Sequence, residues 1–91
     1  MINKSEVFFE SNIQNVGNVS IIEAKGIHFF KAMSKTKDDS SFFLKYLLLE
    51  IVYVNGEKIT ISQLDNMLIK DVSYLTTVVS QLLDDGFKEG I

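Results

Sequence analysis

The chain contains no cysteine, arginine, proline or tryptophan. Without cysteine there are no disulfides and no thiolate ligands for a metal. Arginine supplies bidentate contacts to phosphate and guanine, so its absence removes a common means of binding nucleic acid, and twelve acidic residues against nine lysines give a net charge of −3. The composition therefore disfavours disulfide-stabilised, zinc-binding and nucleic-acid-binding proteins.

Long apolar runs are also missing. No amino-terminal run has the length of a signal peptide or a membrane span, and the longest apolar stretch, Tyr46 to Val54, is interrupted by Glu50. A chain of 91 residues with 46% hydrophobic content supplies one hydrophobic core. We therefore expect a single cytosolic domain over residues 1–91 that does not insert into a membrane.

Residues 5–24 predict a β-hairpin at the amino terminus. Val7 to Phe9 and Val19 to Ile22 are rich in residues that favour strands. Between them, Asn12 to Asn18 is rich in Asn, Gln and Gly, which favour turns. The remaining residues, 26–86, predict a helical part with about four short helices, so the expected fold class is α+β.

The first predicted helix follows the hairpin and carries Phe29, Phe30 and Met33 on one side. It ends in a polar loop over residues 34–39. We interpret the phenylalanines, together with Met33 and Met67, as core residues, because a domain of this size needs nearly all its aromatic side chains to fill one core.

The second predicted helix, over residues 41–52, is apolar on nearly all sides. At 100° per residue, one face carries four aliphatic side chains, Leu44, Leu47, Leu48 and Ile51. The opposite face carries Phe42, Tyr46 and Leu49. We hypothesise that this opposite face is partly exposed and contacts a partner or a second copy. The alternative is that the helix is the centre of the fold, packed between the hairpin and the last helix.

Two local signals follow the second helix. Asn55-Gly56 predicts a small hairpin turn, because both residue types tolerate positive φ. Thr60 and Gln63 have the spacing of a capping box, in which each side chain accepts a hydrogen bond from the other's backbone N–H. A short third helix is therefore expected to begin just after Thr60.

The last predicted helix has a single apolar stripe. Its members are Val72, Leu75, Val78, Val79, Leu82 and Leu83. Asp71 is expected to cap the start of this helix, and Gly86 is expected to end it. One continuous stripe indicates that this helix packs a single side against the core.

Residues able to carry catalysis or to bind a metal are scarce. His28 is the only histidine, which excludes a two-histidine metal site and leaves any catalytic triad resting on one isolated residue. The acidic pairs Asp38-Asp39 and Asp84-Asp85 lie at predicted helix ends, where carboxylates usually act as caps. The five glycines form neither a phosphate loop nor a dinucleotide fingerprint. We predict a protein that is not an enzyme and that needs no metal or cofactor.

The run from Val54 to Leu75 resembles the carboxy-terminal half of the tail assembly chaperones of contractile- and long-tailed bacteriophages. Those proteins typically have a DG-K turn, a hydrophobic residue and a threonine, then a short helix with two spaced apolar residues, then an aspartate before the last helix. Here Asn55 stands where the family more often has Asp. Upstream, Val19 to Ala32 resembles the family's passage from strands towards a leucine-rich helix. The resemblance covers roughly residues 5–83.

This resemblance implies a phage or prophage tail assembly chaperone in the bacterial cytoplasm. Such proteins are not catalysts; they bind the long, hydrophobic tape-measure protein, keep it soluble and help to recruit tail-tube subunits. The implied partners are the tape-measure protein or other tail proteins, with self-association as a further expectation. In many phages a longer, frameshifted form is also made. A phage- or plasmid-encoded inhibitor of a host protein would share the size and the acidic charge.

A second resemblance is to winged helix-turn-helix DNA-binding domains of the multiple-antibiotic-resistance type. In that case Ser73 to Leu83 would be the recognition helix, and Asp85 to Phe87 would lead into the wing. No lysine lies between Val72 and Gly86, although DNA-reading helices place basic side chains at phosphates and bases. The residues after Gly86 are too few for a two-stranded wing, and the amino-terminal third predicts strands where that family has a helix. We therefore favour the chaperone.

Overall fold

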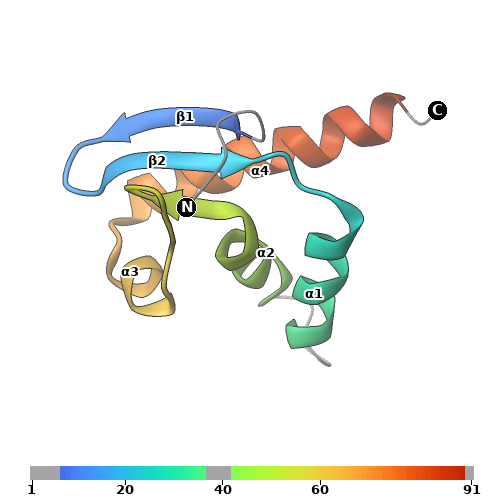
Figure 1. The fold of residues 1–91 in the computed structure, drawn as a ribbon, viewed down its shortest axis with the longest axis horizontal. Helices are drawn as coiled ribbons and strands as arrows, with labels where there is room; N and C mark the ends of the chain where they lie inside the picture. The colour runs from blue at the N-terminus through green and yellow to red at the C-terminus, as the bar shows by residue number, and fades with distance from the viewer. Residues whose placement is uncertain (1–6, 37–41, 90–91) are drawn as a thin grey trace.

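The computed structural model describes residues 7–36 and 42–89, with side chains described as far as Leu83. Two β-hairpins and four helices follow one another in the order ββααββαα (Figure 1). The predicted α+β class, with an amino-terminal hairpin and later helices around a second small hairpin, is confirmed.

The two hairpins form one antiparallel sheet with the strand order β1-β2-β3-β4. The strands are β1 (Val7–Ile13), β2 (Gly17–Ile22), β3 (Val52–Val54) and β4 (Glu57–Lys58). The central pairing places Val19 of β2 opposite Val54 of β3. Each hairpin is predicted by its own turn residues, whereas the pairing between the hairpins has no local signal.

The turns of the two hairpins are hydrogen-bonded to each other. Asn55 and Gly56 have φ values of 52° and 87°, as their turn signal predicts. The N–H of Asn18 donates to Oδ1 of Asn55 at 3.0 Å, and the N–H of Asn55 donates to the carbonyl of Asn18 at 2.7 Å. Gly17 has a φ of 125°, and a Cβ at this position would lie 2.8 Å from the Asn55 side chain. Glycine is therefore required where the two turns meet.

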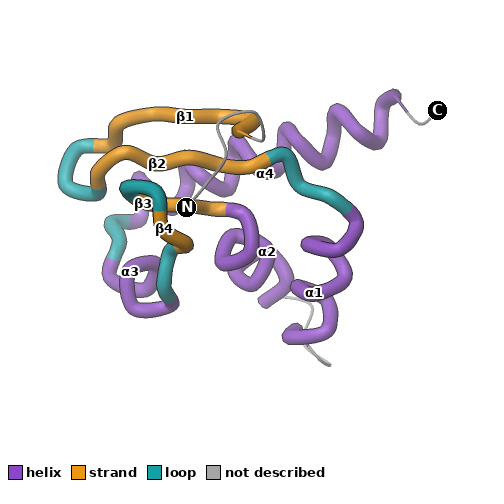
Figure 2. Tube along the Cα trace, viewed as in Figure 1, coloured by secondary structure: helices purple, strands orange, loops and turns teal. Residues whose placement is uncertain are grey.

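The helices are α1 (Gly26–Thr36), α2 (Phe43–Ile51), α3 (Ile61–Asn66) and α4 (Ile69–Glu89). α2 lies between α1 and α3 (Figures 1 and 2), and an ion pair of 2.8 Å joins Lys45 of α2 to Asp65 of α3. The rings of Phe9 on β1 and Tyr74 on α4 meet edge-on, with 5.8 Å between their centroids. α4 therefore packs against the first hairpin.

The core is built mainly from the middle strands, α2 and α4. Its largest fully buried side chains are Val19, Ile21, Leu47, Leu48, Ile51, Val52, Leu75 and Val79. This set includes three members of the predicted inner face of α2 and two members of the predicted stripe of α4. Burial of each such side chain stabilises the fold by about 1.5–3 kcal/mol relative to exposure.

The capping box at the start of α3 is confirmed. Oγ1 of Thr60 accepts a hydrogen bond from the N–H of Gln63 at 3.1 Å, and Oε1 of Gln63 accepts one from the N–H of Thr60 at 2.8 Å. α3 ends at Asn66 and α4 begins at Ile69, so the two helices are separated by a very short connection. The two hydrogen bonds of the capping box satisfy two N–H donors that the start of a helix otherwise leaves unpaired.

Three predicted helix boundaries are wrong. α4 begins two residues before Asp71, because the carbonyl of Leu68 accepts hydrogen bonds from the N–H groups of both Asp71 and Val72. α4 also continues through Gly86 to Glu89, since one glycine inside a helix costs only about 1 kcal/mol relative to alanine. α1 extends to Thr36, into the predicted polar loop.

Candidate functional site

α1 presents its large apolar side chains to solvent. Ile27, Phe30 and Met33 are 57%, 66% and 51% exposed, and Phe29 is exposed to a smaller degree. These four residues, hereafter the α1 apolar face, fall within one half of the helix circumference at 100° per residue. Because apolar side chains gathered on a surface commonly mark contacts with another molecule, this face is the leading candidate for a binding site.

The interpretation of the phenylalanines and Met33 as core residues is wrong for most of those whose side chains are described, which excludes Phe87. The exposed members are Phe8, Phe29, Phe30, Met33 and Phe42. Phe9, Phe43 and Met67 are half-buried and pack against the core. The aliphatic residues of the sheet, α2 and α4 fill the interior, so the aromatic rings are not needed there.

The residues that α1 buries are small. Ala32 and Thr36 are buried, and Oγ1 of Thr36 donates a hydrogen bond to the carbonyl of Ala32 at 2.7 Å. At one edge of the contact between α1 and α2, the rings of Phe29 and Phe43 meet at 5.0 Å between centroids. The small side chains allow the two helices to approach closely, and the large ones remain on the outer side of α1.

Glu50 of α2 is a buried carboxylate between two lysines. Its Oε2 accepts a hydrogen bond from Nζ of Lys35 on α1 at 3.0 Å, and its Oε1 lies 3.6 Å from Nζ of Lys58 on β4. Burial raises the pKa of Glu50, but the hydrogen bond from Lys35 and the charges of Lys58, Lys35 and Lys31 outweigh it, so the pKa lies below its ordinary value. The ionised carboxylate thus ties α1, α2 and β4 together.

His28 forms a hydrogen bond at the start of α1. Its Nδ1 accepts a hydrogen bond from the N–H of Lys25 at 2.9 Å, at the start of α1. This is the role that Gln63 has at the start of α3. Asp38-Asp39 and the side chains of Asp84-Asp85 lie outside the described residues. Within the described part of the chain, no three His, Asp or Glu side chains are grouped closely enough to bind a metal.

The three residues of the predicted partner contact on α2 are exposed to different degrees. Phe42, immediately before the helix, is 48% exposed. Tyr46 and Leu49 are half-buried and pack against the edge of the core. All three lie on the side of α2 away from the buried Leu47, Leu48 and Ile51. Their role as a partner contact stays a prediction.

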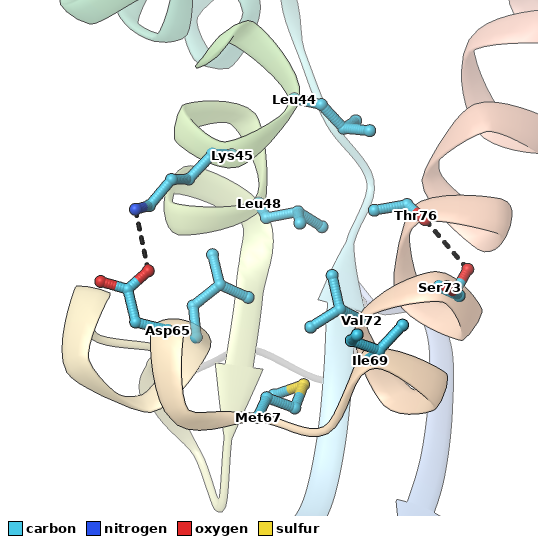
Figure 3. A pocket seen from close by; sticks show the side chains of 10 residues that line it. Leu44, Lys45, Leu48, Asp65, Met67, Ile69, Val72, Ser73 and Thr76 are labelled. Carbon is cyan, nitrogen blue, oxygen red and sulfur yellow. Dashed lines mark hydrogen bonds and ion pairs between the residues drawn. The ribbon is translucent and has the colours of Figure 1, made fainter. Parts of the chain in front are cut away.

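A pocket of about 380 Å³ lies between α2, α3 and α4 (Figure 3). Leu44 and Leu48 of α2 project into it from one side, and Val72 of α4 faces them from the other. Ile69, which is 84% exposed, also lines it. The sequence does not predict this pocket, because its walls come from three helices whose relative positions have no local signal.

The helices assigned to the DNA-binding alternative are α3 and α4. The segment from Asp85 to Phe87, expected to lead into a wing, is part of α4 and does not form a turn. Among the described side chains of the proposed recognition helix, Ser73 to Leu83, the exposed ones are uncharged. This surface therefore lacks the lysines that phosphate contacts require.

No match to this chain is found among protein-family models, curated proteins or solved structures. Among the helices of the described residues, none is both long and apolar enough to cross a membrane. Function is therefore inferred from the surfaces described above and from the resemblance in the sequence.

Proposed function

We propose that this chain is a phage or prophage tail assembly chaperone that binds the tape-measure protein, catalyses no reaction and assists tail assembly in the bacterial cytoplasm. The observation that carries the proposal is the α1 apolar face, on which Ile27, Phe30 and Met33 are each more than half exposed. A long hydrophobic protein awaiting assembly has apolar segments that need temporary cover. An exposed apolar face on a small acidic protein supplies that cover.

The proposed contact is helix against helix. On α1, Ile27 and Phe30, and then Phe30 and Met33, are three residues apart, so they form a continuous ridge. A partner helix with its own apolar stripe packs against such a ridge. The attachment of α1 to α2 through Ala32 and Glu50 holds the ridge in place before binding, which lowers the entropy cost of association.

The elements that carry the family resemblance give further support. Asn55 and Gly56 form the turn, and the helix after it begins at the capping box of Thr60 and Gln63.

Phe42, the most exposed member of the predicted α2 contact, immediately precedes Phe43, whose ring meets Phe29 of the α1 apolar face. We therefore include Phe42 in the proposed binding surface, with Tyr46 and Leu49 at its edge.

The test is suppression of tape-measure aggregation. The tape-measure protein of the same phage or prophage is diluted from denaturant in the presence of the chain, and light scattering is followed. We expect the wild-type chain to suppress scattering and Phe30→Ser to lose most of this effect. Ile69→Ser is the matched control, because it also removes a large exposed apolar side chain, from α4, and we expect it to act like the wild type.

Two results would contradict the proposal. The first is scattering that the wild-type chain leaves unchanged. The second is specific binding of duplex DNA tighter than about micromolar at physiological salt, which would favour the winged helix-turn-helix alternative. A loss of suppression in Ile69→Ser alone would move the binding site from α1 to the pocket between α2, α3 and α4.

A further inference from the structure

α1 is positively charged as well as apolar. From Lys25 to Thr36 the chain has three lysines and no Asp or Glu, although its overall net charge is −3. Lys35 is paired with the buried Glu50. Lys25 and Lys31 are exposed, and they form no ion pair among the described residues. Of these lysines, Lys31 lies at the edge of the apolar face, next to Ile27, and gives that edge an exposed positive charge.

We propose that the segment bound by the α1 apolar face is an amphipathic helix whose apolar stripe is bordered by carboxylates. This inference rests on the proposed function and adds the chemistry of the bound segment. Lys31 is four residues after Ile27, so the two side chains are neighbours on the helix surface. A helix that packs on Ile27 and Phe30 brings the residues beside its own stripe close to Lys31. Carboxylates there are attracted, whereas ammonium groups are repelled.

The dimensions of α1 suit a helical segment. Its 11 residues extend for about 16 Å, which is the length of about three turns of a partner helix. An anionic membrane surface offers the same charge as a carboxylate-rich helix. However, α1 is short, and the rest of the chain is more acidic than the whole, so an anionic bilayer would repel it. Charge complementarity therefore favours an acidic helix over a membrane.

The experiment uses two synthetic helical peptides with the same apolar stripe. In one peptide the stripe is bordered by glutamate, and in the other by lysine; binding to the full chain is measured by fluorescence anisotropy at low and high salt. We expect the glutamate peptide to bind about two- to fivefold more tightly at low salt, the fold-change that one exposed ion pair of ordinary strength supplies. The preference is expected to shrink at high salt because exposed charges are screened.

Charge-reversal variants show which lysine causes the preference for the glutamate peptide. Lys31→Glu should abolish it, whereas Lys70→Glu, which makes the same change of net charge at an exposed position on α4, should retain it. Equal binding of both peptides would overturn the inference and leave the proposed function standing. Binding of neither peptide would contradict helix docking itself. Lys31-dependent binding to phosphatidylglycerol vesicles, without a preference between the peptides, would overturn the inference in favour of a membrane surface.

Discussion

α1 and α4 are both amphipathic helices, but they use their apolar residues in opposite ways. In α4 most of the predicted stripe faces inward: Leu75 and Val79 are fully buried, and only Leu83, the last member, is exposed. In α1 the large apolar side chains face outward, and the buried residues are Ala32 and Thr36. Hydrophobic periodicity therefore identifies the apolar side of a helix, whereas the residues that meet a neighbour decide whether that side is covered.

The largest expected difference in the free energy of unfolding is between truncation of a core side chain and truncation of a surface side chain. Leu75→Ala should lower the free energy of unfolding by about 2–5 kcal/mol, because it leaves a cavity in the hydrophobic core. Phe30→Ala should change it by no more than about 0.5 kcal/mol, because the ring is mostly in solvent. Urea denaturation followed by circular dichroism measures both values. Equal losses would mean that the α1 apolar face is covered in solution.

A second substitution tests the close approach of α1 to α2. Ala32→Leu should lower the free energy of unfolding by about 1–3 kcal/mol, because the larger side chain has no space between the helices. Ser34→Leu is the matched control on the exposed side of α1 and should leave stability nearly unchanged. If both variants are equally stable in urea, α1 does not pack on α2 through its small residues.

Glu50→Gln tests the charge that ties α1 to α2 and β4. At neutral pH it should lower the free energy of unfolding by about 1–2 kcal/mol, because a charge-assisted hydrogen bond becomes a neutral one. The folded-state pKa of Glu50 lies below its ordinary value of 4.5, so its stabilising effect is complete above that value. The effect is lost as the pH falls through the folded-state pKa.

Urea denaturation of the wild type and Glu50→Gln across the acidic range measures this dependence. The difference in unfolding free energy between the two proteins should narrow below pH 4.5. A difference that stays constant from neutral to acidic pH would show that ionisation of Glu50 does not stabilise the fold.

A small effect on stability is also expected at Phe42. Phe42→Lys should change the free energy of unfolding by about 0.5 kcal/mol or less and keep the helical circular dichroism signal. It should reduce the association of the chain with a partner or with a second copy, which light scattering measures. Leu49→Lys should be more destabilising, because Leu49 is half-buried against the core. Unfolding of Phe42→Lys would show that the outer side of α2 is interior and would exclude it as a binding surface.

The elements predicted correctly from the sequence are those fixed by residues close together in the chain. The turn at Asn55 and Gly56 and the capping box of Thr60 and Gln63 depend on backbone geometry within four residues. The stripe of α4 is also local, since it repeats along one helix. The predicted end of α4 at Gly86 is wrong, because glycine is common at helix ends and yet only mildly unfavourable inside a helix.

The features that could not be predicted depend on contacts between distant residues. No local signal indicates that Asn18 pairs with Asn55, 37 residues away, or that two hairpins become one sheet. The exposure of Phe30 and Met33 depends in the same way on which side of α1 meets α2. The sequence therefore predicts the candidate site on α2, at Phe42, Tyr46 and Leu49, while the more exposed apolar surface lies on α1.

The two hydrogen bonds between Asn18 and Asn55 fix the register of β3 against β2. A shift of β3 along β2 by one residue would turn the buried Val52 and Val54 to the opposite side of the sheet, and the two bonds match only one register. These hydrogen bonds also close a long loop of the chain, from Asn18 to Asn55, that contains α1 and α2. The β2–β3 ladder and these two hydrogen bonds hold both ends of this loop, so the segment that carries the α1 apolar face is anchored to the sheet on both sides.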